Sequence, residues 1–408
     1  MTIPPSLCID LGASFTKIAY RDRPDATSRL LQDNDLPDDQ HFCIPSVAAR
    51  NVARDVWVFG VEAMDLKSGS RVEVFQNWKA QLFDPDREVT FDVLDDIPDE
   101  VRKVLLEGDP ALRALDVATR FLAWLHDEQL PAMLGSTDFR DAQVQLCVPD
   151  FVLDDPLAMR LEGILRDIGF RNASTYTLSE PKANLIGVLT EGANALTRNG
   201  RPNPAVMFGD TTVLKRLAHP GQAVLLVDVG AFTTDFALAG FSQELDAGFA
   251  QDPSHSMAHG IRKLDEWLLA DAPDLDRERV EASAAEREHF HATIHGGIAG
   301  PRPEEFGLTQ PVVDETVGRF TQAILDGIET FVNQHEPEGL VAAVLTGGGS
   351  NIRGIANRLA RALYERDIAT LHAPKDTDAP LDRVMYGLRP ELVRGASAIG
   401  GCSILYRS

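Results

Sequence analysis

Residues 225–241, LLVDVGAFTTDFALAGF, contain an apolar run, an aspartate, a glycine turn, two threonines and a second apolar run. The apolar runs have strand propensity, and Gly230 permits a turn where a side chain would clash. Residues 9–19, IDLGASFTKIA, repeat the pattern in the shared frame Asp-x-Gly-Ala-x-x-Thr-x-x-Ala. One acidic turn of this kind is common, but two copies in one register indicate a duplicated β-hairpin.

A duplicated hairpin with an acid at its turn suits a ligand held between two facing lobes. Asp10 and Asp228 occupy the equivalent acidic positions of the two copies. Each turn offers backbone N–H groups that can bind phosphate oxygens, and a carboxylate that can hold the waters of a magnesium ion. The repeat therefore predicts a site for phosphates and magnesium.

The composition is that of a globular protein with more than one core. The chain has 408 residues, of which 44% are hydrophobic and 25% charged. Its formal net charge of −23 argues against direct nucleic-acid binding, because phosphate backbones are bound through lysine and arginine. The same charge is compatible with ATP, which needs only a local positive or magnesium-bearing site.

The cysteine pattern favours a cytoplasmic protein. The four cysteines are far apart and most lie in apolar, strand-like runs, which predicts buried reduced thiols rather than metal ligands: Cys8, Cys43, Cys147 and Cys402. The first strand starts almost at once, so we expect no signal peptide. No apolar run approaches the roughly 18 residues of a membrane span, and we expect none.

Glu180 lies in the stretch TLSEPKA, where a strand ends and a helix over residues 182–189 is expected. The residue before a proline is held extended, so this carboxylate would project from the strand end. The alternative is an acid at a helix N-terminus that complements the helix dipole. Residues taken alone favour the second interpretation.

Residues 341–363, VAAVLTGGGSNIRGIANRLARAL, predict a strand that ends at Thr346, a turn of three glycines and a helix. Three glycines at such a turn let a flat ligand approach the backbone, and the helix offers free N–H groups. Three glycines alone would be weak evidence of a ligand site. Following the repeated hairpins, they support one.

Hydrophobic periodicity predicts further elements. Helices are expected over 115–130, with Asp116 as N-cap, and over 155–169, 260–270 and 312–332, with strands over 41–50 and 55–60. Residues 192–221 are predicted to form a long loop. Five histidines match no known metal-binding spacing and are interpreted as surface residues: His255, His259, His289, His291 and His295.

Four motifs in this order carry a family resemblance: CIDLGASFTK, LSEPKANLIG, LLVDVGAFTTDF and VLTGGGSNIRG. Together they resemble the ATPase core shared by actin, the seventy-kilodalton heat-shock chaperones, bacterial actin-like filament proteins and sugar kinases. The resemblance covers nearly the whole chain, up to ELVRGASAIGGCSI, which is similar to the family's closing helix. It implies a two-lobed α/β actin-like ATPase fold, built from duplicated ribonuclease-H-like domains, with nucleotide in the interlobe cleft.

The resemblance also implies a domain organisation. Lobe I would span residues 1–181, with an inserted subdomain at about 41–115, and lobe II would span 182–385, with an insert at about 261–335. Residues 386–408 would form a closing helix that packs back toward lobe I.

By the same resemblance, Asp10 and Asp228 would hold waters of a Mg²⁺ ion that bridges the phosphates of ATP. Glu180 would orient the attacking water, which overrides the interpretation as a simple helix-terminal acid. Lys17 matches the actin-like pattern and Lys79 the chaperone pattern, and either would neutralise charge at the γ-phosphate. Phosphate contacts are expected from Gly12, Ala13, Ser14, Gly230, Ala231, Thr233 and Thr234, and the adenosine would lie against Gly347, Gly348, Gly349 and Asn351.

One position departs from the family pattern. Many relatives carry three glycines after the second aspartate, whereas this chain has Gly230-Ala231-Phe232. A phenylalanine there would crowd the phosphate loop or force a different turn. We therefore expect ATP binding with slow hydrolysis.

Three functions follow from the resemblance. The first is a heat-shock-70-like, chaperone-type ATPase that switches conformation between its ATP and ADP states, favoured by the insert, by Lys79 and by the stretch VPDFVLDDP. No peptide-binding domain is expected, so a protein partner would contact the lobes. The alternative is a bacterial actin-like protein that self-associates into filaments, for example in plasmid segregation or a cytoskeleton, favoured by Lys17 and the TGGG motif. The third, a small-molecule kinase, lacks an evident base for a hydroxyl acceptor.

Overall fold

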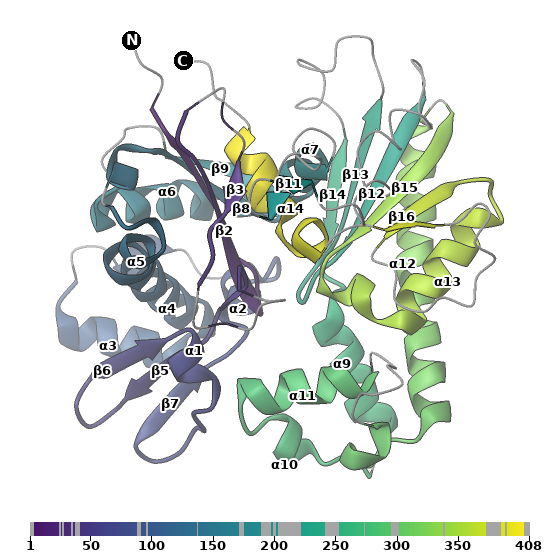
Figure 1. The fold of residues 1–408 in the computed structure, drawn as a ribbon. Coiled ribbons are helices and arrows are strands. Elements are labelled where there is room, and N and C mark those ends of the chain that lie inside the picture. Colours follow the sequence, from purple (N-terminus) through teal and green to yellow (C-terminus); the bar gives the residue numbers. More distant parts are fainter. Residues whose placement is uncertain are drawn as a thin grey trace.

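The structure is a computed structural model of the chain. It describes residues 4–23, 26, 28–33, 36, 41–87, 91–94, 97–136, 138–170, 175–188, 197–198, 201–202, 222–240, 253–272, 274–294, 302–337, 339–372, 385–387 and 390–403. Two lobes lie side by side, each built on its own β-sheet, with helices α7 (Glu180–Ile186) and α14 (Pro390–Ser403) between them (Figure 1).

Lobe I is built on the sheet that contains the first hairpin. Strand β1 (Ser6–Asp10) pairs antiparallel with β2 (Phe15–Arg21) and parallel with β8 (Gln143–Val148). Within the described residues the strand order is β3-β2-β1-β8-β9, with β4 also pairing with β2; the remaining strands are β3 (Arg29–Leu30), β4 (Ile44–Pro45) and β9 (Thr175–Ser179). Every residue of β1 and β8 is buried, because helices cover both faces of this sheet.

The helices of lobe I begin where local capping signals occur. Helix α4 (Pro110–Trp124) starts at a proline, and the carboxylate of Asp109 accepts hydrogen bonds from the backbone N–H groups of Ala111 and Leu112. The prediction that Asp116 caps this helix is therefore wrong: Asp116 lies inside it and pairs with Arg120. A π-helical turn (Leu125–Gln129) joins α4 to α5 (Leu130–Leu134), and α6 (Pro156–Ile168) follows β8.

A smaller sheet lies at the outer end of lobe I. Strands β6 (Val56–Phe59), β5 (Ala48–Asn51) and β7 (Val72–Phe75) form it in that order. The predicted strand over 41–50 is two short strands, β4 and β5, separated by residues 46 and 47. Three helices accompany the small sheet: α1 (Val61–Met64), α2 (Trp78–Leu82) and α3 (Asp99–Gly108).

Lobe II repeats the hairpin at the centre of a second sheet. Strand β12 (Ala223–Val229) pairs antiparallel with β13 (Thr234–Gly240) and parallel with β15 (Leu340–Thr346). The described order is β14-β13-β12-β15-β16-β17, where the outer strands are β14 (Ser254–Met257), β16 (Ala369–His372) and β17 (Met385–Gly387). Asp10 pairs in register with Lys17, and Asp228 pairs in register with Asp235. The predicted duplication of the hairpin is thus confirmed.

Helices cover the second sheet and extend beyond it: α9 (Ile261–Asp271), α10 (Arg277–Val280), α11 (Ala284–Ile294), α12 (Gln310–His335) and α13 (Arg353–Tyr364). The expected helices at 260–270 and 312–332 correspond to α9 and α12. Of the predicted loop at 192–221, the structure describes only β10 (Thr197–Arg198) and β11 (Arg201–Pro202), and the rest lies outside the described residues.

The two lobes meet where α7 and α14 pack backbone to backbone. A Cβ atom on Gly400 would lie 1.8 Å from the carbonyl oxygen of Ala183, and one on Gly187 would lie 2.0 Å from that of Ala396. Only glycine fits at either position. The domain boundary predicted at residue 181 falls within α7 and stays a prediction.

The four cysteines are buried free thiols, as predicted. No helix in the described part of the chain is long and apolar enough to span a membrane.

Candidate functional site

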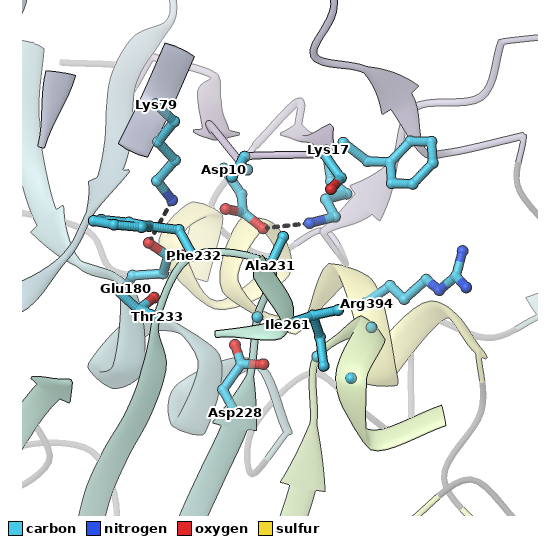
Figure 2. A pocket seen from close by; sticks show the side chains of 18 of the residues that line it. Asp10, Lys17, Lys79, Glu180, Asp228, Ala231, Phe232, Thr233, Ile261 and Arg394 are labelled. Carbon is cyan, nitrogen blue, oxygen red and sulfur yellow. Dashed lines mark hydrogen bonds and ion pairs between the residues drawn. The ribbon is translucent and has the colours of Figure 1, made fainter. Parts of the chain in front are cut away.

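A cavity lies where the two hairpin turns face each other. Figure 2 shows side chains from both lobes that point into it. Most of the predicted site residues line this cavity: Asp10, Gly12, Ala13, Ser14, Lys17, Lys79, Glu180, Asp228, Gly230, Ala231, Thr233, Gly347, Gly348 and Gly349. The structure therefore brings together residues that are up to 339 positions apart in the sequence.

The first hairpin supplies an aspartate and a lysine. The Nζ atom of Lys17 lies 3.4 Å from Oδ2 of Asp10, and Asp10 is 2% exposed. Burial lowers the pKa of Lys17, but the nearby acidic groups, first Asp10 and then others that include Glu180 and Asp228, together outweigh burial and raise the pKa, so this lysine stays charged. The turn itself requires glycine, because a Cβ atom on Gly12 would lie 2.0 Å from the carbonyl oxygen of Phe15.

The second hairpin supplies Asp228. The side-chain amide of Asn184 donates a hydrogen bond of 2.6 Å to its Oδ2 atom. Burial, together with the nearby Glu180 and Asp10 carboxylates, raises the pKa of Asp228 to about 7. Asn184 was not predicted as a site residue, although it lies only four positions after Glu180 in the same motif.

Glu180 forms a buried ion pair with Lys79 across the cavity. The Nζ atom of Lys79 lies 2.8 Å from Oε2 of Glu180. Burial raises the pKa of Glu180, and the positive charge of Lys79 offsets only part of that rise. Burial lowers the pKa of Lys79, but nearby carboxylates, first Glu180 and then Asp10, outweigh burial and raise the pKa above its ordinary value. Glu180 is the first residue of α7 and Ser179 is the N-cap, so its place at a helix N-terminus is confirmed and the interpretation as an extended residue is wrong. Its carboxylate still faces the cavity (Figure 2).

Both candidate lysines reach the cavity. Lys17 enters from β2 and Lys79 from α2, each against a different carboxylate. The structure therefore does not select one of the two family patterns over the other.

Phe232 lines the cavity from the second hairpin turn. Its ring is half-buried and packs against the hydrophobic core of lobe I, although the residue belongs to the lobe II hairpin. The turn keeps its hairpin form, since the N–H of Gly230 donates to the carbonyl of Thr233 at 2.9 Å. The phenylalanine thus occupies space in the cavity beside this turn.

The glycine turn after β15 closes one side of the cavity. Gly347 has φ +82°, and a Cβ atom there would lie 2.1 Å from Oδ1 of Asp228. Its N–H donates to the carbonyl of Val393 in α14. Two other predicted residues do not line the cavity: Thr234 is fully buried and its hydroxyl donates to the carbonyl of His259, and Asn351 ends the short helix η9 (Gly348–Asn351).

Residues that sequence reasoning missed complete the cavity wall. Ile261, Glu288, His291, Ile352 and Arg394 also line it. Ile261 on α9 and Glu288 and His291 on α11 reach the site through tertiary packing and carry no local motif. Ile352 lies in the motif VLTGGGSNIRG and Arg394 in the stretch ELVRGASAIGGCSI, but neither was predicted as a site residue.

The histidines form no metal site: within the described residues, no group of three or more potential ligands could hold an ion. Two of them are also not surface residues. His259 is buried, and His291 contacts both carboxylate oxygens of Asp265 at 2.9 Å. His295 lies outside the described residues.

The carboxylates of the cavity fit a divalent cation. Asp10 and Asp228 come from opposite lobes, and in each the buried Oδ1 atom has no hydrogen-bond partner among the described residues. Asp235, which pairs in register with Asp228, also has a buried Oδ1 atom without a partner among the described residues, but it does not line the cavity. Buried carboxylate oxygens without partners are costly, and hard oxygen donors of this kind suit Mg²⁺ and its waters.

No protein-family model matches the sequence, and no curated protein matches it. The fold of the chain, in contrast, matches solved structures. The crystal structure of MreB 5 of Spiroplasma citri bound to AMPPNP is 13% identical, with a TM-score of 0.52 over 98% of this chain and 94% of that chain. The structure of the same protein bound to ADP is 14% identical over the same shares, with a TM-score of 0.52. The chain therefore has the two-lobed α/β fold of these MreB5 structures.

Proposed function

We propose that the chain binds Mg-ATP in this cavity, hydrolyses it slowly to ADP and phosphate, and changes the closure of its lobes as it does so. One observation carries the proposal: Asp10 and Asp228 face the same cavity from the equivalent turns of two lobes, each with an oxygen that has no partner among the described residues. A ligand that brings a cation and phosphates would satisfy both.

The residues around the cavity have distinct roles in this proposal. Asp10 and Asp228 would hold waters of the magnesium ion, which supplies charge neutralisation at the phosphates when bound. Lys17 and Lys79 would face phosphate oxygens as charged donors, and the turns at Gly12 and Gly230 would offer backbone N–H groups. Glu180 would orient the attacking water and take up its proton, and its ion pair with Lys79 keeps the carboxylate placed.

A bacterial actin-like protein is better supported than a heat-shock-70-like module. The similarity to MreB5, whose structures contain AMPPNP and ADP, extends over 94% of that chain. We propose that ATP favours self-association of this chain into filaments. A chaperone-like switch that acts on a protein partner is the competing outcome, because Lys79, the lysine of the chaperone pattern, also lines the cavity.

Calorimetric titration tests the binding claim directly. We expect ATP and ADP to bind with one site per chain in the presence of Mg²⁺, with weaker binding of ATP after chelation of the metal. The rate of phosphate release, measured on the same preparation, should be slow but higher than the rate of a Glu180→Ala variant. If neither nucleotide binds in the presence of Mg²⁺, the proposed function is wrong.

A further inference from the structure

Asp150 links the two lobes beside the N-cap of α7, the helix that carries Glu180. It follows β8 in lobe I and begins the short helix η4 (Asp150–Val152). Its Oδ1 atom accepts a hydrogen bond of 2.5 Å from the hydroxyl of Ser179, at the end of β9 in lobe I. Its Oδ2 atom accepts one of 2.7 Å from the hydroxyl of Ser254, on β14 in lobe II. One carboxylate thus joins two segments of the chain that belong to different lobes.

The same residue makes a second contact with lobe II. The backbone N–H of Asp150 donates to the hydroxyl of Ser256 at 3.0 Å. Ser256 pairs in register with Asp235 on the neighbouring strand. The contacts of Asp150 therefore extend to the lobe II hairpin, in which Asp235 pairs with Asp228.

On the lobe I side, the contact reaches Glu180 through one residue. Ser179 is the N-cap of α7: its hydroxyl donates to Asp150 and accepts from the backbone N–H of Lys182 at 3.3 Å. An N-cap fixes the direction of the first helical turn, and Glu180 is the first residue of that turn. In Figure 1, α7 lies between β9 of lobe I and β14 of lobe II.

We infer that Asp150 is a positioning residue that couples the relative placement of the lobes to the orientation of Glu180. When β14 is in its place, Ser254 holds the Asp150 carboxylate, Asp150 holds the Ser179 hydroxyl, and Ser179 holds the first turn of α7. If lobe II moves away, the carboxylate loses the hydrogen bond from Ser254, the Asp150 N–H loses Ser256, and the cap of α7 is less constrained. The attacking water would then be aligned only while the lobes are closed.

The coupling can be tested without any nucleotide. Ser254→Ala removes the lobe II hydroxyl and touches no cavity residue. We expect amide hydrogen exchange in α7 to become about tenfold faster, although the substitution lies on β14 and not in α7. Thr316→Ala is a matched control, because the Thr316 hydroxyl donates to Asp271 at 3.0 Å and both residues lie in lobe II. Ser254→Thr, which keeps the hydroxyl, should restore slow exchange.

Kinetics test the second part of the inference, which rests on the proposed function. Ser254→Ala should lower kcat for ATP about tenfold and change KM less than about twofold, because alignment and not binding is lost. Unchanged exchange in α7, or an equal increase in the Thr316→Ala control, would overturn the coupling. If exchange responds as expected and the wild-type protein binds no ATP, the coupling stands and the proposed function fails. If exchange responds and ATP is hydrolysed with unchanged kcat, Asp150 does not position Glu180.

Discussion

The ammonium of Lys79 and the carboxylate of Glu180 lie 2.8 Å apart and are both almost fully buried. Lys79 belongs to α2 and Glu180 to α7, so the pair joins two helices of the cavity wall. Bulk water solvates neither charge well, because the side chain of Lys79 is only 3% exposed and that of Glu180 only 11%. Each group therefore depends on the other for its charged state.

Lys79→Met should destabilise the protein by about 3 kcal/mol, because it leaves the Glu180 carboxylate buried without its counter-charge. The double variant Lys79→Met with Glu180→Gln should recover most of that loss. Urea unfolding of the wild type, both single variants and the double variant measures the coupling. Additive losses in the double variant would show that the two groups do not stabilise each other.

Asp10→Ala and Glu180→Ala should separate binding from hydrolysis. Asp10→Ala removes a proposed magnesium-water ligand, so we expect Mg-ATP affinity to fall at least about tenfold. Glu180→Ala should slow phosphate release about a hundredfold and largely preserve binding, because the residue acts on the attacking water. Asp116→Asn is the control: it also removes a carboxylate, but one that pairs with Arg120 on α4 and does not line the cavity. Wild-type binding and turnover in both variants would contradict the site assignment.

The size of the side chain at position 232 should limit the rate of ATP hydrolysis. Its ring lines the cavity beside the proposed position of the phosphates and contacts the lobe I core. In the series Phe232→Leu and Phe232→Ala, we expect phosphate release to rise stepwise by a few-fold in total, as space for the attacking water increases. Single-turnover measurements separate this effect from product release. A stepwise decrease would mean that the ring is needed for lobe closure.

Gly347 and Gly348 are adjacent, but they should respond differently to alanine. At Gly347 the φ of +82° and the close Oδ1 atom of Asp228 leave no room for Cβ, whereas a Cβ on Gly348 meets no atom within 4 Å. We expect Gly347→Ala to destabilise the protein by about 2 kcal/mol or more and Gly348→Ala by less than about 0.5 kcal/mol. Thermal unfolding of the two variants measures this. Equal stability of the two variants would contradict this geometry of the turn.

His291 should make stability depend on pH above neutrality. Burial lowers its pKa, but Asp265 and Glu288 outweigh burial and raise the pKa to about 10, from an ordinary value of 6.5. The stabilisation is therefore fully present below about pH 6.5 and is lost as the pH rises toward 10. In urea unfolding at pH 6, 8 and 10, His291→Gln should lose this dependence. His289→Gln, at a more exposed position on the same helix, should keep it.

The repeated hairpin made part of the site predictable from sequence. Asp10 and Asp228 occupy equivalent positions of the two copies, so their convergence followed from the repeat. Glu180 lies outside the repeat, and only the family resemblance assigned it to the site. The wall formed by His291 and Arg394 was not predictable, since helix packing between distant segments brings them to the cavity. The start of α4 was missed for a different reason: the capping signal at Asp109-Pro110 is present, but it lies near the end of the predicted insert at about 41–115, and the helix was expected to begin only at residue 115.

Sedimentation of the purified protein with Mg-ATP, with ADP and without nucleotide, with phosphate release followed in the same tubes, tests the central claim most directly. The account predicts that the protein pellets with Mg-ATP, stays in the supernatant with ADP or without nucleotide, and releases phosphate slowly. Phosphate release without pelleting would contradict filament formation and favour a chaperone-like switch. If the protein neither pellets nor releases phosphate in any of the tubes, the account as a whole is contradicted.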